Sequence, residues 1–361
     1  MTRMKRDQPA VSLLIPVYNV EKYLSRCLES ARDQTLENIE VICINDGSTD
    51  GSPEIIREFV EADARFRSVD KENSGYGASM NMGLRAARGK YVGILESDDF
   101  IEPQFLEILF NTAEKNKAEV VKSNFFFYWS SPKEKNELFE LVTPSMANRL
   151  VSPQEEQDIF YLKPSIWSAI YRRDFLLENS IDFLETPGAS YQDAGFNFKV
   201  WASAVRVVYL HEAYLHYRQD NESSSVNSRG KIYCVCDEYR EMERYLEERP
   251  AKKACLEPVL VKMRYDSYMW NYERLAPEFQ LEFLECMSRE FNADQERGAL
   301  DFDYFEPWKI IDLKTIIDSP ELYHAQRTSC GNQGRLGKTL HYYRVGGLPL
   351  LVKIARSKLG R

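Results

Sequence analysis

The sequence predicts an α/β fold, in which a mainly parallel sheet is covered by helices on both faces. Three observations indicate this fold. Short apolar runs, such as residues 11–17 and 39–44, are typical of strands buried on both faces. These runs alternate with segments of helical periodicity, such as residues 20–33. The chain has 361 residues, which is enough for the sheet domain and a second domain.

The expected elements follow one another in a regular order over the first half of the chain. Strands are expected at residues 11–17, 39–44, 66–69, 91–95, 119–127, 165–171 and 204–209, and helices at 20–33, 53–64, 76–87, 103–115 and 190–202. Residues 130–137 and 219–230 are polar and are expected to be loops. From residue 231 the pattern is helical and charged. We therefore expect one domain over residues 1–228 and a mainly helical domain over residues 229–361.

Composition excludes several classes of protein. The net charge of −9 argues against a nucleic-acid binder, which usually carries a basic surface. The seven cysteines show no spacing typical of a metal site, so free thiols in a cytoplasmic protein are expected. The polar N-terminus has no apolar core of a signal peptide, and no run reaches the roughly 18–20 apolar residues that cross a bilayer.

Polar, turn-forming residues follow each of the first four expected strands. They are Pro16-Val17-Tyr18-Asn19, Asn45-Asp46-Gly47-Ser48, Asn73-Ser74-Gly75-Tyr76-Gly77 and Glu96-Ser97-Asp98-Asp99. Ligands of parallel α/β sheets bind at the carboxyl ends of the strands, so these four segments are expected to form one rim. The rim is the candidate binding site.

The acidic segment Glu96-Ser97-Asp98-Asp99 carries the most specific chemistry. Three carboxylates within four residues repel one another unless a cation or hydrogen-bond donors compensate them. Mg²⁺ and Mn²⁺ take oxygen ligands and bridge substrate phosphates, so a metal held here would stabilise a departing diphosphate. The alternative is that Asp98 or Asp99 caps the helix expected after Pro103.

These segments resemble the signatures of the family 2 inverting glycosyltransferases, which have the GT-A fold. The resemblance rests on residues 11–19 with Glu21, and on residues 45–51, 81–89 and 95–103, in the family's order and separation, and it covers roughly residues 10–225. It implies transfer of a sugar from a nucleotide-diphosphate donor, here a UDP-sugar, to a hydroxyl of a glycan or of a polyprenyl-diphosphate-linked glycan. Bacterial surface polysaccharide synthesis is the implied setting.

The resemblance also implies roles for residues of the rim. Pro16, Tyr18, Glu21 and Asp46 match positions that border or bond the nucleotide base, and Asn73, Gly77 and Asn81 match positions near the ribose and diphosphate. Glu96, Ser97 and Asp98 match the metal-binding DxD motif, with Glu in place of the first Asp. Asp98 is then the expected ligand of Mn²⁺ or Mg²⁺, and Glu96 a ribose or metal-bound water contact.

Three residues from the second half of the domain complete the implied site. Asp193 matches the family's catalytic base, although Gln192 replaces the Glu that usually precedes it. An inverting transfer needs such a base to take the proton of the acceptor hydroxyl. His216 is expected to ligate the metal and Arg218 to contact the diphosphate, and residues 221–226 resemble a loop that orders over bound donor.

Two other functions remain open. A nucleotidyltransferase uses a similar sheet and metal. It requires a glycine-rich loop with basic side chains after the first strand, where this chain has residues 16–19. An inactive carbohydrate-binding relative is the second alternative, because Glu96 and Gln192 depart from the family pattern.

The C-terminal tail has a pattern of its own. Residues 347–360 alternate apolar and basic side chains, which predicts either an ordinary packed helix or an amphipathic helix on the inner face of the membrane.

Overall fold

In the computed structural model, residues 8–186, 188, 190–221, 232–329 and 335–359 are described. The chain divides into two compact units, Met1–Ser224 and Ser225–Arg361. The boundary expected at residue 228 falls within residues 222–231, outside the described residues. Each unit is treated by itself below.

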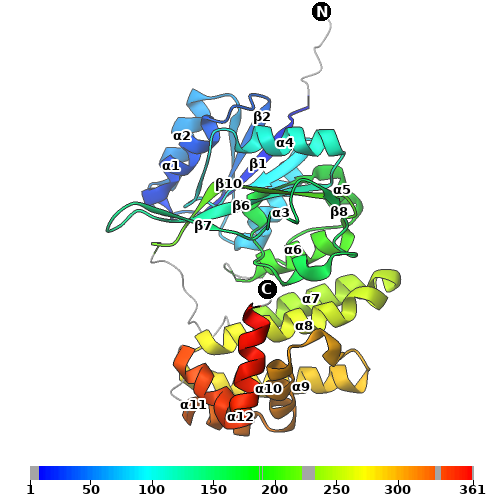
Figure 1. The fold of residues 1–361 in the computed structure, drawn as a ribbon. Coiled ribbons are helices and arrows are strands. Elements are labelled where there is room, and N and C mark those ends of the chain that lie inside the picture. Colours follow the sequence, from blue (N-terminus) through cyan, green and yellow to red (C-terminus); the bar gives the residue numbers. More distant parts are fainter. Residues whose placement is uncertain (1–7, 187, 189, 222–231, 330–334, 360–361) are drawn as a thin grey trace, which may run out of the picture. The chain divides into compact units, whose positions relative to one another are not determined.

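The first unit is built on a ten-stranded sheet with helices on both faces (Figure 1). Its strands are β1 (Val11–Val17), β2 (Ile39–Asn45), β3 (Phe66–Asp70), β4 (Tyr91–Ile94), β5 (Phe100–Ile101), β6 (Val120–Trp129), β7 (Lys135–Phe139), β8 (Leu150–Val151), β9 (Ala169–Arg172) and β10 (Val207–Arg218). Its helices are α1 (Glu21–Arg32), α2 (Ser52–Ala62), α3 (Tyr76–Ala86), α4 (Phe105–Asn116), α5 (Arg173–Glu178) and α6 (Gln192–Ser203). The α/β fold with a mainly parallel core predicted from the sequence is confirmed.

The order of the strands explains where a ligand can bind. The sheet runs β3-β2-β1-β4-β9-β6-β10-β5, and β1 to β4 are mutually parallel. The order reverses between β1 and β4, because the chain first builds outward from β1 to β3 and then returns to the other side of β1. Loops at such a switch point leave in opposite directions and open a crevice at the carboxyl ends of the strands. The segments after β1 and β4 lie at this switch point.

The core of the sheet contains β1 and β2, the strands whose bounds the sequence predicted most closely. Every residue of β1 and β2 is buried, as expected for parallel strands covered on both faces. Residues 130–137, predicted to be a loop, are in part the edge strand β7, which pairs antiparallel with β6. Its side chains are mostly exposed, so it lacks the apolar pattern of a core strand.

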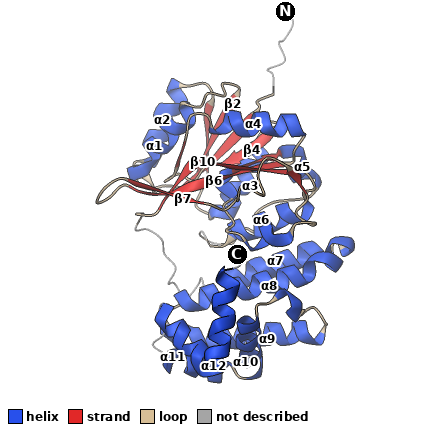
Figure 2. Ribbon diagram, viewed as in Figure 1, coloured by secondary structure: helices blue, strands red, loops and turns tan. Residues whose placement is uncertain are grey.

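The second unit consists of helices in its described residues (Figure 2). They are α7 (Cys234–Glu247), α8 (Pro250–Arg274), α9 (Pro277–Glu296), α10 (Pro307–Asp318), α11 (Pro320–Ser329) and α12 (Arg335–Leu359). Large aromatic side chains such as Tyr239, Tyr268 and Phe291 fill its core. Helix α12 is interrupted at Gly347, whose φ of 63° is non-helical. None of the described helices is long and apolar enough to cross a membrane.

Candidate active site

The loops after β1 and β2 are joined by hydrogen bonds. Oδ1 of Asn19 accepts from the Thr49 N–H (2.8 Å), and the Glu21 N–H donates to Oδ2 of Asp50 (3.0 Å). Pro16 is buried within β1, whereas the Tyr18 side chain is 52% exposed on the rim. The two loops therefore form one wall, from which Tyr18 is free to contact a ligand.

Asp46 anchors the loop that follows β3. Its carboxylate accepts from the backbone N–H groups of Ser74 and Gly75 (2.9 Å each) and is paired with Lys71. Gly47 has a φ of +71°, and a Cβ on it would lie 2.9 Å from the Asn73 nitrogen. The structure thus brings Asp46 and Asn73 to the same place, with the Asp46 oxygens already bonded within the protein.

The start of α3 packs against residues 183–186 and Gly188. A Cβ on Gly77 would lie 2.1 Å from the Leu184 carbonyl oxygen, so only glycine fits there. The Asn81 side chain accepts from the Phe183 N–H and donates to the Phe183 carbonyl (2.8 Å each). The side chain of Asn81 therefore supports this segment, and its predicted place near the ribose stays a prediction.

The acidic segment after β4 does not cap α4. The N-cap of α4 is Gln104, and β5 separates the acidic residues from the helix. Glu96 instead accepts a hydrogen bond at Oε1 from the Tyr76 hydroxyl (2.7 Å), and Asp98 accepts at Oδ2 from the Asn221 amide (2.8 Å). The capping interpretation is therefore wrong.

Asp99 is the most buried acid of this segment, at 1% exposure. Its Oδ1 accepts from the Arg218 N–H (2.8 Å), and its Oδ2 has no hydrogen-bond partner among the described residues. Burial, and next the neighbouring Asp98, raise the pKa of Asp99 well above its ordinary value. The backbone N–H at the end of β10 thus holds this carboxyl behind the acidic rim.

Burial also governs the other carboxyls of the rim. It raises the pKa of Glu96 to about 8, an effect reduced by the Tyr76 hydrogen bond and increased by Asp98 and Asp193. Burial likewise raises the pKa of Asp193, and the charge of Lys163 opposes this. Because Asp98 and Asp193 both act on Glu96, the end of β4 and the start of α6 lie within electrostatic reach of each other. A cation would relieve the repulsion of these carboxyls.

Asp193 lies in the first turn of α6. Its Oδ1 accepts from the Ala194 N–H (2.9 Å), and the helix begins after Tyr191, whose φ of 60° is left-handed. Gln192 is buried and donates to the Thr186 hydroxyl (2.8 Å). The residue that replaces the family's usual Glu thus supports Thr186 and Gly188, which lie against the start of α3.

Arg218 is buried beneath the acidic rim. Its Nε donates to the Asp98 carbonyl (2.9 Å), its Nη1 pairs with Asp220 (3.2 Å), and its guanidinium lies 4.4 Å from the centre of the Tyr23 ring. The side chain is 4% exposed. These contacts position the acidic segment, and the predicted contact of Arg218 with a diphosphate stays a prediction.

The two ring nitrogens of His216 are both engaged. Nε2 lies 2.8 Å from Oε1 of Glu102, and Nδ1 lies 2.6 Å from Oδ1 of Asn136. The imidazole is stacked on Phe100 with a centroid separation of 4.3 Å. Among the described residues, His216 makes no hydrogen bond or ion pair with Asp98, and metal binding by His216 requires the loss of one of its hydrogen bonds.

Two residues of the site have roles that the sequence does not predict. The sequence places Tyr76 in a glycine-rich turn, and in the structure its hydroxyl holds Glu96. Lys163 lies in an irregular segment, yet its charge acts on Asp193. The tyrosine between Gly75 and Gly77 was a usable signal, whereas nothing near Lys163 in the sequence indicated its place.

Comparison with known proteins identifies this arrangement. Residues 12–180 match the family model described as glycosyl transferase family 2. The chain carries a family 2 glycosyltransferase domain. EpsH of Bacillus subtilis, which is named for the same class of enzyme, is 35% identical over 222 residues, which cover 59% of this chain and 61% of EpsH. Glycosyltransferase GlyA of Streptococcus pneumoniae is 32% identical over 58% of this chain and 30% of its own length. The chain thus spans less than two thirds of these relatives.

Solved structures extend the likeness over both units of the chain. Residues 1–349 of S. aureus TarS, solved with UDP-GlcNAc, match with a TM-score of 0.68 at 20% identity, over 90% of this chain and 93% of that one. At this identity the likeness shows the fold alone. The GT-A fold of the glycosyltransferase domain and a helical C-terminal region are confirmed.

Proposed function

We propose that the protein is an inverting glycosyltransferase that moves a sugar from a UDP-sugar to a hydroxyl of a glycan or lipid-linked glycan. The observation that carries this proposal is that Glu96, which follows β4 and neighbours Asp98, lies within electrostatic reach of Asp193, at the start of α6, with Tyr76 beside both. Support for the donor comes from the UDP and UDP-GlcNAc complexes of TarS. Support for a polysaccharide or surface-glycan product comes from the family and its bacterial members.

The donor set of the rim fits a hard divalent cation such as Mn²⁺ or Mg²⁺. The groups are carboxylate oxygens, the pKa values of Glu96 and Asp99 are raised by burial, and a buried oxygen of Asp99 lacks a partner among the described residues. Asp98 is the proposed ligand, because its side chain is less buried than that of Asp99 and its Oδ2 is bonded to Asn221 alone among the described side chains. When bound, such an ion supplies positive charge to the departing diphosphate.

The proposed reaction is a single displacement. The Asp193 carboxylate takes the proton of the acceptor hydroxyl while the oxygen of that hydroxyl bonds to the anomeric carbon of the donor. The bond from this carbon to the diphosphate oxygen breaks, and the nucleoside diphosphate leaves with its electron pair. Tyr76 fixes Glu96 beside the donor, and the loops after β1 and β2 border the nucleotide, with Tyr18 exposed toward it.

The decisive experiment measures release of UDP from a panel of UDP-sugars in the presence of Mn²⁺. We expect release by the wild-type protein and its loss, by about 10²-fold or more, in Asp98→Ala. Asp174→Ala, which changes an exposed aspartate of α5, is the matched control. Full activity of Asp98→Ala would contradict the metal assignment. Absence of release with every donor, while UDP still binds, would favour the inactive carbohydrate-binding alternative.

We further propose that α12 contacts the membrane surface. Leu348 and Val352 lie four residues apart on this helix and are exposed (66% and 46%). Lys353 and Arg356, also exposed, lie beside them and carry positive charge. An apolar strip flanked by basic side chains is attracted to anionic lipid. Such contact would bring the enzyme to a lipid-linked acceptor.

A further inference from the structure

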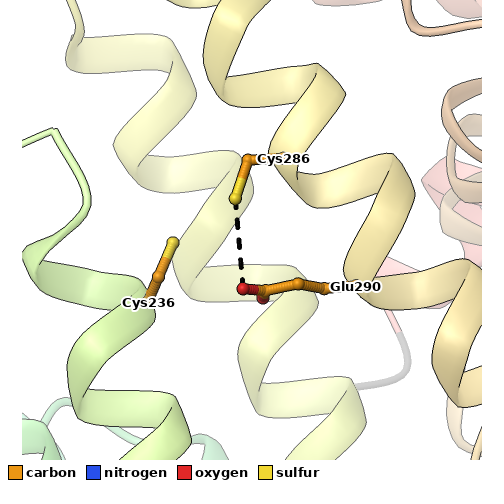
Figure 3. Close-up of side chains that lie close together, drawn as sticks. All are labelled: Cys236, Cys286 and Glu290. Atoms are coloured by element: carbon orange, nitrogen blue, oxygen red, sulfur yellow. Dashed lines mark hydrogen bonds between the residues drawn. The ribbon is translucent and has the colours of Figure 1, made fainter.

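Two cysteines and a glutamate meet in the interior of the second unit (Figure 3). Cys236 lies on α7, and Cys286 and Glu290 lie on α9. One ligand atom from each, the two Sγ atoms and a carboxylate oxygen, all lie within 4.8 Å of one another, and the Cys286 sulfur is 3.9 Å from Oε1 of Glu290. The spacing of four residues places Cys286 and Glu290 on one face of α9.

This set of atoms has the chemistry of a zinc site. Zn²⁺ is bound by cysteine thiolates at about 2.3 Å and by carboxylate oxygens at about 2.0–2.2 Å, in tetrahedral geometry. Two sulfurs on one tetrahedral ion stand about 3.8 Å apart, so the three ligand atoms need to approach by about 1 Å at most. Thiolates select zinc-type cations over the hard ions proposed for the first unit.

Two neighbouring side chains hold the carboxylate of Glu290 in place. The Tyr268 hydroxyl donates to Oε2 of Glu290 (2.5 Å), which orients the carboxylate and leaves Oε1 toward Cys286. Arg240 donates a hydrogen bond to the same Oε1 (3.2 Å), so a cation there would share this oxygen with the guanidinium. With both thiols ionised, three negative charges would face the charges of Arg240 and a divalent ion, and the site would be neutral.

The hydrogen bond between the two thiols raises the pKa of Cys236 and lowers the pKa of Cys286. The pKa of Cys286 lies below its ordinary value, first because Cys236 donates a hydrogen bond to its sulfur and also because Arg289 and Arg240 lie near. Burial acts in the opposite direction. Metal binding would release the thiol protons, as it does in other thiolate sites.

We propose that Cys236, Cys286 and Glu290 bind a zinc-type divalent cation that links α7 to α9. The described residues offer these three ligands, so the fourth position is open to water. The ion would act as a cross-link within the helical unit. It is separate from the Mn²⁺ or Mg²⁺ proposed for sugar transfer.

The test uses the full chain, stripped with a chelator under reducing conditions and titrated with Cd²⁺ and with Zn²⁺. We expect one equivalent of Cd²⁺ to produce the ultraviolet absorption of cadmium–thiolate bonds, and Zn²⁺ to raise the melting temperature. Cys236→Ser and Cys286→Ser should abolish the absorption, and Glu290→Gln should weaken binding by about 10-fold or more. Cys234→Ser, a buried thiol on α7, and Cys255→Ser, an exposed thiol on α8, are the controls and should retain it.

Two results would overturn the proposal. One is absence of the thiolate absorption in the wild-type protein, or its persistence in both Cys236→Ser and Cys286→Ser. The other is formation of a disulfide between the two cysteines, seen as a loss of two hydrogens by mass spectrometry, in protein that binds no metal. Should the serine variants fail to fold, protection of Cys236 and Cys286 from alkylation by Zn²⁺ in the wild-type protein, mapped on peptides, decides the question.

Discussion

The hydroxyl of Tyr76 donates a hydrogen bond to Oε1 of Glu96 across 2.7 Å, which joins the start of α3 to the end of β4. The Tyr76 ring packs edge-on against Phe183, 5.8 Å between centroids. The phenol therefore connects three parts of the chain: the glycine-rich turn, the acidic segment and the residues around Phe183. A single hydroxyl thus sets the direction of a carboxyl group in the proposed donor site.

We expect Tyr76→Phe to reduce kcat/KM for the donor by about tenfold, because loss of one hydrogen bond costs about 1–1.5 kcal/mol. The ring and its packing remain, so the melting temperature should change little. Tyr91→Phe is the matched control, since its hydroxyl bonds Glu114 (3.0 Å) away from the rim. Equal effects of the two variants on kcat/KM would mean that Tyr76 acts through stability alone.

How much of the fold the sequence could predict depended on the surroundings of each strand. Strand β1 was predicted residue for residue, and β2 to within one residue, because apolar runs covered on both faces leave a continuous signal. Strand β7 was missed because its exposed, polar residues at the edge of the sheet carry no such signal. Strand β10 extends to Arg218, nine residues beyond the expected end at residue 209, because its second half is bulged and partly polar.

The rim was predictable from strand ends, but its internal bonding was not. Asp99 is held by the backbone of Arg218, which lies 119 residues later in the chain. His216 is also held by residues distant in the sequence: its partner Glu102 follows β5, and its partner Asn136 lies on β7. Local sequence predicts which residue types reach the rim, whereas such long-range pairs decide which oxygen or nitrogen remains for a ligand.

We expect Asp193→Asn to lower transfer by about 10²-fold or more while donor binding is kept, because an amide cannot take the acceptor proton. The measurement is kcat for transfer together with Kd for UDP-sugar by calorimetry. Asp174→Asn on α5 is the control for the loss of an aspartate. A large rise of the donor Kd in Asp193→Asn would show that Asp193 holds the donor or its metal instead.

The contacts of His216 lead to a prediction that separates two roles. We expect His216→Gln to lower the melting temperature, because the stack on Phe100 is lost, and to leave the affinity for Mn²⁺ within about threefold of wild type. Donor-dependent Mn²⁺ activation and thermal unfolding are measured side by side with Asp98→Ala. A loss of Mn²⁺ affinity as large as that of Asp98→Ala would establish His216 as the metal ligand that the family resemblance implies.

Lys122 predicts a pH dependence of stability. The residue is 1% exposed, and its ammonium group donates to the Ser165 carbonyl and, at 3.1 Å, to the Ser168 hydroxyl. Burial lowers its pKa from 10.5 to about 7. Between these two values the unfolded chain holds a proton that the native protein lacks, so this residue makes the free energy of unfolding rise with pH. Lys122→Met should remove that rise.

Urea unfolding of both proteins between pH 6 and pH 9 provides the measurement. Lys122→Met should be the more stable protein near pH 6, where the native lysine is charged, and its advantage should shrink as the pH increases above 7. Identical slopes of unfolding free energy against pH in the two proteins would refute the depressed pKa.

The last prediction concerns α12 and anionic membranes. We expect Leu348→Ser combined with Val352→Ser to weaken binding to vesicles containing phosphatidylglycerol by about tenfold, since two exposed apolar side chains no longer enter the lipid. The fold should persist, because neither side chain is buried. Leu322→Ser, which changes a similarly exposed leucine (52%) on α11, is the control.

Binding of α12 to these vesicles should also fall with added salt, because the attraction through Lys353 and Arg356 is screened. Vesicle binding that is unaffected by the double variant would exclude α12 as the membrane contact, whatever the activity of the enzyme on soluble acceptors.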